Sequence, residues 1–423
     1  MKKTVGRKGT PVIYILVICA IVLGCLAAAV PTARAEDNCE PDFVQRSGAI
    51  GRICMPPEGK WNGDLVVYAH GYVAPTEPIA IPEDQLTIPP GDPDGISIPA
   101  MANGLDFAFA VTSYRVNGLA VTQGIADLMD LVRVFKTTHS EPNRVYLVGP
   151  SEGGLITALA VEQRPNVFDG GLSACGPVGS FWAQINYWGD VRVLFDYFFP
   201  DVIPGSPVKI PERVIKNWET RYKGRIERAL RKNPHATARL LKVARVPVDP
   251  ADPDSGVEAL VQLLWYNVFA TNDGVRKLGG QPYDNLLRYY RGSDNDWRLN
   301  RDVARFRADP AAIAEIKAHY ATSGQLGGPL VTFHTLRDPI VPYWHEPLYR
   351  FKINAKGSGA LHTNIPGLRY GHCNLTPAGV LAVFALLVYK VTGNELPDVE
   401  RVLPYAQARV EYQDLVRAYR ALR

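Results

Sequence analysis

The sequence predicts an α/β protein with a doubly wound, mostly parallel sheet and a largely helical cap inserted late in the chain. Short apolar runs alternate with stretches of helical periodicity through the first part, which favours strand–helix–strand units with right-handed crossovers. Between residues 178 and 328 helical periodicity dominates, and the strand pattern returns at residue 329. Two parts of one sheet are therefore expected to flank an inserted helical segment.

Each element is predicted from its periodicity and from the turn residues beside it. A hairpin is expected within 40–60, and a surface loop rich in proline, aspartate and glycine within 73–98. Buried strands are expected at 64–69, 107–113, 145–148, 168–174, 329–334 and 358–366. Helices are expected at 98–104, at 122–138, from 155 to 160 and at 379–391.

The first 35 residues have the pattern of a signal peptide. Four basic residues precede an almost unbroken apolar run from Val12 to Val30, and a small-x-small cleavage site, Ala33-Arg34-Ala35, follows. We therefore expect an exported protein, periplasmic or extracellular, without stable membrane insertion after cleavage. An uncleaved N-terminal anchor and a lipoprotein attached through Cys25 remain as alternatives.

The remaining chain is expected to contain a first core segment at 36–177, the helical cap at 178–328 and a second core segment at 329–423. The chain has 46 Lys and Arg and 42 Asp and Glu residues, and residues 1–35 hold five of the basic residues and none of the acidic ones. The rest of the chain is therefore almost neutral, which argues against a nucleic acid or an anionic membrane surface as a partner. The sequence leaves the oligomeric state open.

Four cysteines follow the cleavage site, and an even number in an exported protein favours disulfides. Cys39 with Cys54 would join the N-terminal hairpin, and Cys175 with Cys373 would link two distant parts of the chain. Four buried free thiols are the alternative.

The stretch from Val145 to Gly154 carries the strongest chemical signal. An apolar, strand-like run ends in Gly149-Pro150-Ser151-Glu152-Gly153, and a helical pattern follows. Such a strand–turn–helix context is what a nucleophile elbow requires. Because the turn is tight, only glycine is expected to fit at positions 149 and 153. Ser151 is therefore the candidate nucleophile.

A serine hydroxyl needs a base to take its proton and an acid to orient that base. His372 is the predicted base because it follows the last expected strand and sits beside a glycine, and His345 and His362 are its competitors. Asp338 is the predicted acid because it lies just past the strand ending at His334. An ordinary turn-capping aspartate is the alternative for Asp338.

The backbone amides of Tyr72 and Glu152 are the predicted oxyanion donors, because His70-Gly71-Tyr72 ends the first strong strand and Glu152 follows the nucleophile. The aromatic stretch that begins at Phe181 supplies candidate substrate-pocket residues. Phe181, Trp182 and Trp188 are the candidates, and packing within the cap is the alternative for most of this stretch.

Together these motifs resemble the α/β-hydrolase superfamily. The resemblance runs from about Asp64 to Val391 and implies a Ser151–Asp338–His372 triad. Within the superfamily the chain is similar to exported bacterial esterases and to hydrolase domains grouped with prolyl oligopeptidases. The His372-Cys373 pair is also similar to tannases and feruloyl esterases, in which a disulfide ties the histidine to the residue before the serine. That residue is Pro150 here, so we expect Cys175 to serve as the partner instead.

The predicted activity is hydrolysis of a carboxylic ester through an acyl-serine intermediate, with no cofactor and no metal. A small-molecule ester is the expected substrate, and its identity stays open. A serine exopeptidase acting on a short peptide would use the same triad, and an acyltransferase would differ only in its acceptor. A binding protein on a hydrolase scaffold predicts a missing triad member, and none is missing.

Overall fold

The computed structural model describes residues 38–92, 94–396 and 399–422. The predicted signal segment, residues 1–35, lies outside the described residues. An eight-stranded sheet organises the described chain, in the strand order β1-β2-β6-β3-β7-β8-β9-β10. The strands from β6 to β10 in this order pair in parallel, and β1 and β2 are antiparallel at one edge. The expected doubly wound, mostly parallel fold is confirmed.

The strands of this sheet match the expected runs closely, apart from the last. They are β1 (Phe43–Val44), β2 (Ile50–Cys54), β3 (Asp64–Tyr68), β6 (Ala108–Thr112), β7 (Arg144–Pro150), β8 (Gly170–Ala174), β9 (Leu330–Arg337) and β10 (His362–Tyr370).

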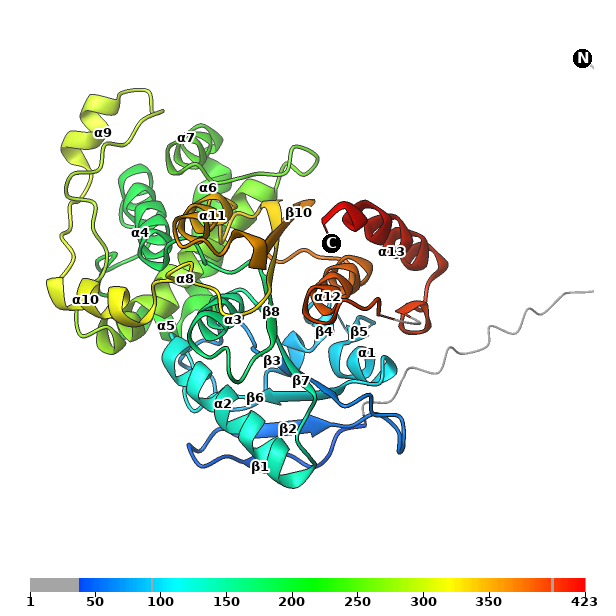
Figure 1. Ribbon diagram of the computed structural model, residues 1–423. Coiled ribbons are helices and arrows are strands. Elements are labelled where there is room, and N and C mark those ends of the chain that lie inside the picture. The colour runs from blue at the N-terminus through cyan, green and yellow to red at the C-terminus, as the bar shows by residue number, and fades with distance from the viewer. Residues whose placement is uncertain (1–37, 93, 397–398, 423) are drawn as a thin grey trace, which may run out of the picture. The chain divides into compact units, whose positions relative to one another are not determined.

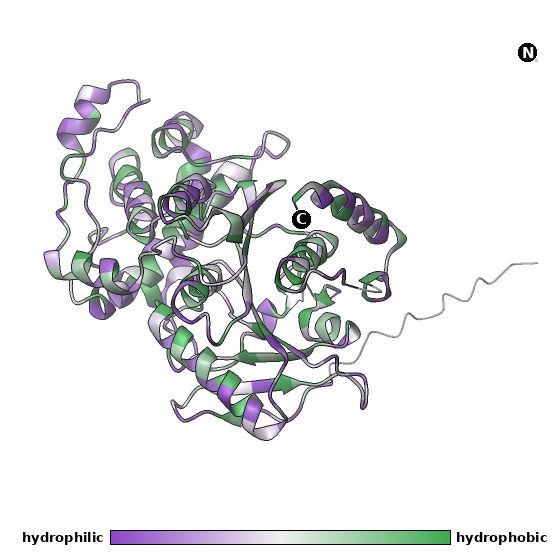
Figure 2. Ribbon diagram, viewed as in Figure 1, coloured by the Kyte–Doolittle hydropathy of each residue, from purple (hydrophilic) through white to green (hydrophobic). Residues whose placement is uncertain are grey.

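Alternate residues of each strand pack on opposite faces of the sheet, as the strand pleat requires. In β3, Leu65 and Val67 belong to the apolar cluster shared with α2 and α3, whereas Val66 and Tyr68 belong to the cluster shared with α1, α12 and α13. Figure 1 shows these two groups of helices on either side of the sheet, and Figure 2 shows apolar residues concentrated along it. The sheet is therefore covered on both faces, as a parallel sheet requires.

The covering helices in the core segments are α1 (Ile98–Gly104), α2 (Val121–Thr138), α3 (Glu152–Gln163), α11 (His345–Ala355), α12 (Pro377–Thr392) and α13 (Ala406–Tyr419). Ten consecutive residues of α3, from Glu152 to Val161, are buried. A helix buried on all sides is held between the sheet and its neighbours, so it fixes the turn at its N-terminus.

Between β8 and β9 the described chain forms helices rather than ladder strands. These are α4 (Phe181–Phe198), α5 (Glu212–Lys216), α6 (Lys223–Lys232), α7 (Pro234–Ala244), α8 (Ser255–Lys277), α9 (Asp296–Asp302) and α10 (Pro310–His319), with a π-helical turn at Trp218–Tyr222. Their apolar side chains form a cluster that includes Phe195, Trp218 and Leu264 and is joined by Ile340 and Val341 from the turn after β9. This arrangement supports treating residues 178–328 as a cap, which we retain as a proposal.

Two details differ from the expectations. The segment at 73–98 contains a short 3-10 helix (Glu83–Gln85) and a two-stranded sheet of β4 (Thr87–Ile88) and β5 (Ile96–Ser97). Strand β10 begins at His362 rather than at residue 358, because Gly359–Leu361 forms a 3-10 turn. None of the helices in the described part of the chain has the length and apolar character that crossing a membrane requires.

Candidate active site

Ser151 stands at the turn between β7 and α3, in the conformation that the motif predicts. Its φ of 55° and ψ of −121° lie in a region that a residue with a side chain rarely adopts. The flanking glycines are required by close approach. A Cβ at Gly149 would lie 2.5 Å from the Gly153 carbonyl oxygen, and a Cβ at Gly153 would lie 1.9 Å from the Ala69 carbonyl oxygen. The turn therefore packs against the end of β3 and presents the serine beside it.

His372 is the imidazole that the fold brings to this serine. Its Nε2 lies 2.9 Å from the Ser151 Oγ, although the two residues are 221 positions apart. Its Nδ1 lies 2.7 Å from the Asp338 Oδ2. Because a carboxylate only accepts hydrogen bonds, Nδ1 carries the proton and the Nε2 lone pair faces the serine hydroxyl. This tautomer is the one that can take up a proton from the serine.

Asp338 is fully buried in the turn after β9. Its Oδ1 accepts hydrogen bonds from the amides of Ile340 (2.8 Å) and Val341 (2.9 Å), which leaves Oδ2 directed at His372. Burial alone would raise the pKa of Asp338, but the imidazoles of His372 and His334 lower it to about 2. The group is therefore an ionised and well-oriented carboxylate.

The loop at 70–72 lies directly against the serine, since a Cβ at Gly71 would stand 3.4 Å from the Ser151 Cβ. The Gln85 side chain holds this loop by accepting a hydrogen bond from the Gly71 amide at 2.7 Å. Among the described residues, no group accepts a hydrogen bond from the amide of Tyr72 or of Glu152. Both predicted oxyanion donors are therefore unengaged and near the serine.

His70 has a structural place in the same loop. Its Nδ1 lies 2.7 Å from the Gly71 carbonyl oxygen, and its ring stacks on Tyr114 with the ring centroids 3.9 Å apart. Burial lowers the pKa of His70 to about 4, so the ring is neutral. A neutral imidazole can donate from Nδ1 to this carbonyl and so shape the loop.

Two cysteine pairs lie at disulfide distance. The Sγ atoms of Cys39 and Cys54 are 1.98 Å apart, and those of Cys175 and Cys373 are 2.23 Å apart. The second pair joins the end of β8 to the residue directly after His372. This disulfide therefore attaches the histidine loop to the strand next to the elbow.

A largely apolar pocket opens at Ser151 and is walled by the cap. Phe181 and Trp188 line it as predicted, together with Ile185, Tyr266 and Leu278, which the sequence did not single out. Trp182 is absent from this wall. Its side chain is 37% exposed, and its indole nitrogen donates to the Pro282 carbonyl oxygen. We therefore withdraw Trp182 as a pocket residue.

Glu152, whose side chain is buried, is one of the residues that line this pocket. Its Oε1 accepts a hydrogen bond from the Ala120 amide at 2.9 Å. Burial raises the pKa of Glu152 to about 8, against the opposing effect of that hydrogen bond. The side chain is therefore mostly neutral at pH 7, so the pocket holds little negative charge there.

The competing histidines have other partners. His345 Nδ1 accepts hydrogen bonds from the amides of Gly179 and Ser180, and His362 Nε2 lies 3.1 Å from the Thr332 hydroxyl. Neither forms a described hydrogen bond with Ser151. Across the described ranges, no group of three or more His, Cys, Asp or Glu side chains is placed as metal ligands would be.

Comparisons with known proteins were made by family model, by sequence and by structure. A family model described as the prolyl oligopeptidase family matches residues 108–182, from β6 to the start of α4. The search of curated proteins gives no match.

Solved structures similar to this chain include peptidases and esterases. The acylaminoacyl peptidase of Pyrococcus horikoshii is 14% identical over 86% of this chain, with a TM-score of 0.43, and this chain spans only 44% of its length. An esterase of Pyrococcus furiosus is 10% identical over 80% of this chain and 83% of its own, with a TM-score of 0.41. Feruloyl esterase B of Aspergillus oryzae is 16% identical over 83% of this chain and 79% of its own, with a TM-score of 0.43.

The sheet topology of this chain and its turn at Ser151 are consistent with the match to the family model. The strand order with its parallel core is the architecture that the motifs imply. The turn at Ser151 has the geometry of a nucleophile elbow, and the matched segment contains it. In its sheet topology and in this turn the chain therefore resembles the α/β-hydrolase superfamily.

Proposed function

We propose that the protein is an exported esterase that cleaves a carboxylic ester through an acyl-serine intermediate. The observation that carries this proposal is the continuous chain of contacts from Asp338 through His372 to Ser151, which ends at the mouth of an apolar pocket. The two cysteine pairs support export, because disulfides persist in oxidising compartments.

In the proposed reaction, Ser151 attacks the ester carbonyl while His372 Nε2 takes the serine proton. The carbonyl oxygen becomes an oxyanion, and the amides of Tyr72 and Glu152 donate hydrogen bonds to it. His372 then gives its proton to the departing alcohol, which leaves an acyl-serine. Water attacks this intermediate with His372 again as base, and the acid is released. Asp338 holds the imidazole tautomer throughout.

The lining of the pocket supports an apolar acyl group as the moiety bound next to Ser151. Leu119, Phe181, Ile185 and Leu278 contribute aliphatic and aromatic surface there. Each buried methylene contributes about 0.8 kcal/mol of transfer free energy, so chain length should control kcat/KM.

A serine exopeptidase is the second candidate. The match to the prolyl oligopeptidase family model favours it, and the Glu152 carboxyl in the pocket offers a partner for a substrate ammonium group. A charged ligand there would first have to ionise a carboxyl whose pKa is about 8. For this reason we rank the ester substrate first.

One screen tests both candidates. The protein without residues 1–35 is assayed with p-nitrophenyl esters of graded acyl length and with aminoacyl p-nitroanilides, and Ser151→Ala is the control. We expect turnover of the esters, loss of that turnover in Ser151→Ala, and labelling of Ser151 by a fluorophosphonate probe. Preferred turnover of the anilides would replace the esterase proposal with the peptidase. Labelling that persists in Ser151→Ala would remove Ser151 as the nucleophile.

A further inference from the structure

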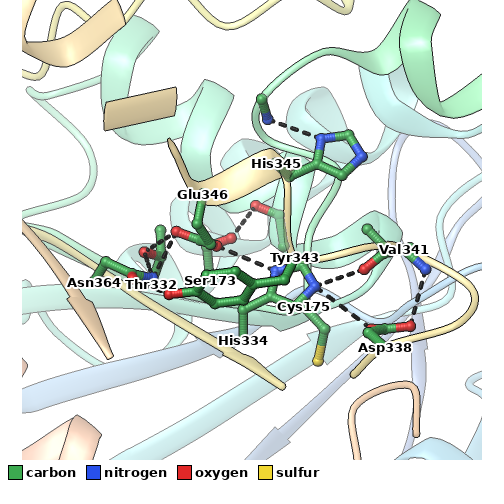
Figure 3. Close-up of polar contacts among 12 residues, drawn as sticks. Ser173, Cys175, Thr332, His334, Asp338, Val341, Tyr343, His345, Glu346 and Asn364 are labelled. Atoms are coloured by element: carbon green, nitrogen blue, oxygen red, sulfur yellow. Dashed lines mark hydrogen bonds and ion pairs between the residues drawn. The ribbon is translucent and has the colours of Figure 1, made fainter. Parts of the chain in front are cut away.

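A second polar network lies directly behind Asp338, on the side away from His372. Its centre is His334, a fully buried side chain of β9. Figure 3 shows His334 between Asp338 and Glu346, with Thr332, Tyr343 and Asn364 around the glutamate. Apart from Asp338, none of these side chains forms a described hydrogen bond or ion pair with Ser151 or His372. The proposed triad does not use them.

The Nε2 atom of His334 must carry a proton, because every partner there is an acceptor. It lies 2.7 Å from the Val341 carbonyl oxygen and 3.5 Å from the Asp338 Oδ2. A carbonyl cannot donate, and Asp338 is already engaged by two amides and by His372 as an acceptor. The open question is therefore the state of the other ring nitrogen.

Nδ1 of His334 lies 3.2 Å from the Glu346 Oε1. The other oxygen of Glu346, Oε2, accepts hydrogen bonds from the Asn364 amide at 2.7 Å and from the Thr332 hydroxyl at 2.6 Å. The Tyr343 hydroxyl donates to the Asn364 Oδ1 at 2.7 Å, which fixes that amide with its NH2 group toward the glutamate. Because Oε2 already accepts from two donors, Oε1 is the oxygen of Glu346 that accepts a hydrogen bond from Nδ1.

Both ring nitrogens of His334 therefore donate, and the ring is an imidazolium. Burial alone would lower the pKa of His334, but its hydrogen bonds to Asp338 and Glu346 raise it to about 10. The neighbouring His345 is equally buried and shows the opposite case. Its Nδ1 accepts from two backbone amides, and burial lowers its pKa. The two carboxylates, and not burial itself, account for the charge on His334.

We propose that His334 is a positioning residue: a buried imidazolium, paired with Glu346, that keeps Asp338 ionised and oriented behind His372. This proposal rests on the proposed triad. A cation behind Asp338 partly offsets the negative charge of this carboxylate, so the potential at His372 is less negative. Without that cation, a more negative field at Nδ1 would favour protonated His372, and a protonated His372 cannot accept the serine proton.

Other titratable groups also approach this network. Tyr343 lies in the turn before α11, and His362 begins β10. Helix α11 contributes His345, Arg350 and Lys352. The cap helices contribute Tyr187 and Tyr266. Tyr187 donates to the Pro339 carbonyl oxygen in the same turn as Asp338. Among the described residues, the partners of Asp338 whose side chains can be positively charged are His334 and His372.

The test compares pH profiles of kcat/KM for a p-nitrophenyl ester. His334→Gln keeps a donor for the Val341 carbonyl but leaves Glu346 as an unpaired buried charge, so the double variant His334→Gln/Glu346→Gln is the main one. We expect the double variant to react with a fluorophosphonate probe. We also expect the acid limb of its kcat/KM profile to move to higher pH by on the order of half a pH unit or more. His345→Gln, which removes a neighbouring buried histidine without touching Asp338, should leave the acid limb in place.

A measurement on the unaltered protein complements the variants. In the nitrogen NMR spectrum of the histidine side chains, one of the 8 histidines should remain protonated on both ring nitrogens at pH 8. The proposal would be overturned if the double variant and the unaltered protein had the same acid limb. It would also be overturned if no histidine were doubly protonated at pH 8. Failure of the unaltered protein to react with the fluorophosphonate would instead refute the proposed function, so the two failures are distinguishable.

Discussion

Replacing Asp338 by Asn is the sharpest test of the proposed triad, because the geometry dictates how the amide must sit. The Ile340 and Val341 amides donate to Oδ1, so the oxygen of the asparagine has to face them. Turning the side chain over would lose both hydrogen bonds, each about 0.5–1.5 kcal/mol between neutral groups, and would place the NH2 group against two amide donors. The NH2 group therefore takes the position of Oδ2 and faces His372.

This orientation reverses the tautomer of His372. An NH2 group 2.7 Å from Nδ1 requires that atom to accept, so the proton moves to Nε2 and the lone pair facing Ser151 is lost. In other serine hydrolases the equivalent change lowers kcat by about 10⁴-fold. We expect a loss of about 10³- to 10⁴-fold here, which corresponds to about 4–5.4 kcal/mol in the activation free energy.

The assay measures kcat on a p-nitrophenyl ester, together with the rate of fluorophosphonate labelling and the melting temperature. Asp64→Asn is the matched control, because Asp64 is also largely buried but pairs with Arg144 at the start of β3 and β7, away from the elbow. Its kcat should stay close to that of the unaltered protein. A folded Asp338→Asn protein that retains more than a tenth of the activity would refute the assignment of Asp338.

Three further predictions follow from the pocket and the disulfide. Burial raises the pKa of Glu152 from 4.5 to about 8, so between these pH values the folded chain keeps a proton that the unfolded chain releases. The free energy of unfolding should therefore fall with rising pH in this window, by up to about 1.4 kcal/mol per pH unit. Urea unfolding of Glu152→Gln at pH 5 to 8 should show a smaller dependence of this free energy on pH. Trp188→Ala should shift the preferred p-nitrophenyl ester toward longer acyl chains, whereas Trp182→Ala, which lies off the pocket wall, should not. Replacing Cys175 and Cys373 by Ser removes a link across 198 positions and should lower stability by up to about 5 kcal/mol, measured by urea unfolding, and should lower kcat because the loop carrying the histidine loses its anchor.

The parts of the fold that the sequence predicted well are those with strong local patterns. The helix expected at 98–104 occurs at those positions because a proline at its second residue and a serine cap define its start. Strand β10 was misplaced by several residues because its sequence includes Pro366 and Gly367, which are unusual in a strand. Its place at the sheet edge tolerates a proline that cannot donate to a further strand. That edge position is a tertiary fact that no local pattern reveals.

The candidate site divides in the same way. Helical spacing places Phe181 and Trp188 within about 20° of one another around α4 but turns Trp182 by about 100°, so the spacing itself argues against grouping the three. The sequence indicated that His334 was buried, but its partner Glu346 lies on a different element, twelve residues further along the chain. Ile185, Tyr266 and Leu278 enter the pocket wall only because α4 and α8 pack together. Such contacts depend on the packing of the cap.

The division of the chain around the pocket also bears on how this protein could be changed. The proposed catalytic side chains and oxyanion amides lie before residue 178 and after residue 328. The wall residues of the pocket lie in the segment between them: Phe181, Ile185, Trp188, Tyr266 and Leu278. Mutations in that middle segment can alter substrate preference while the catalytic groups keep their spacing. If the proposed activity holds, its selectivity can therefore drift, or be engineered, in one continuous stretch of the gene.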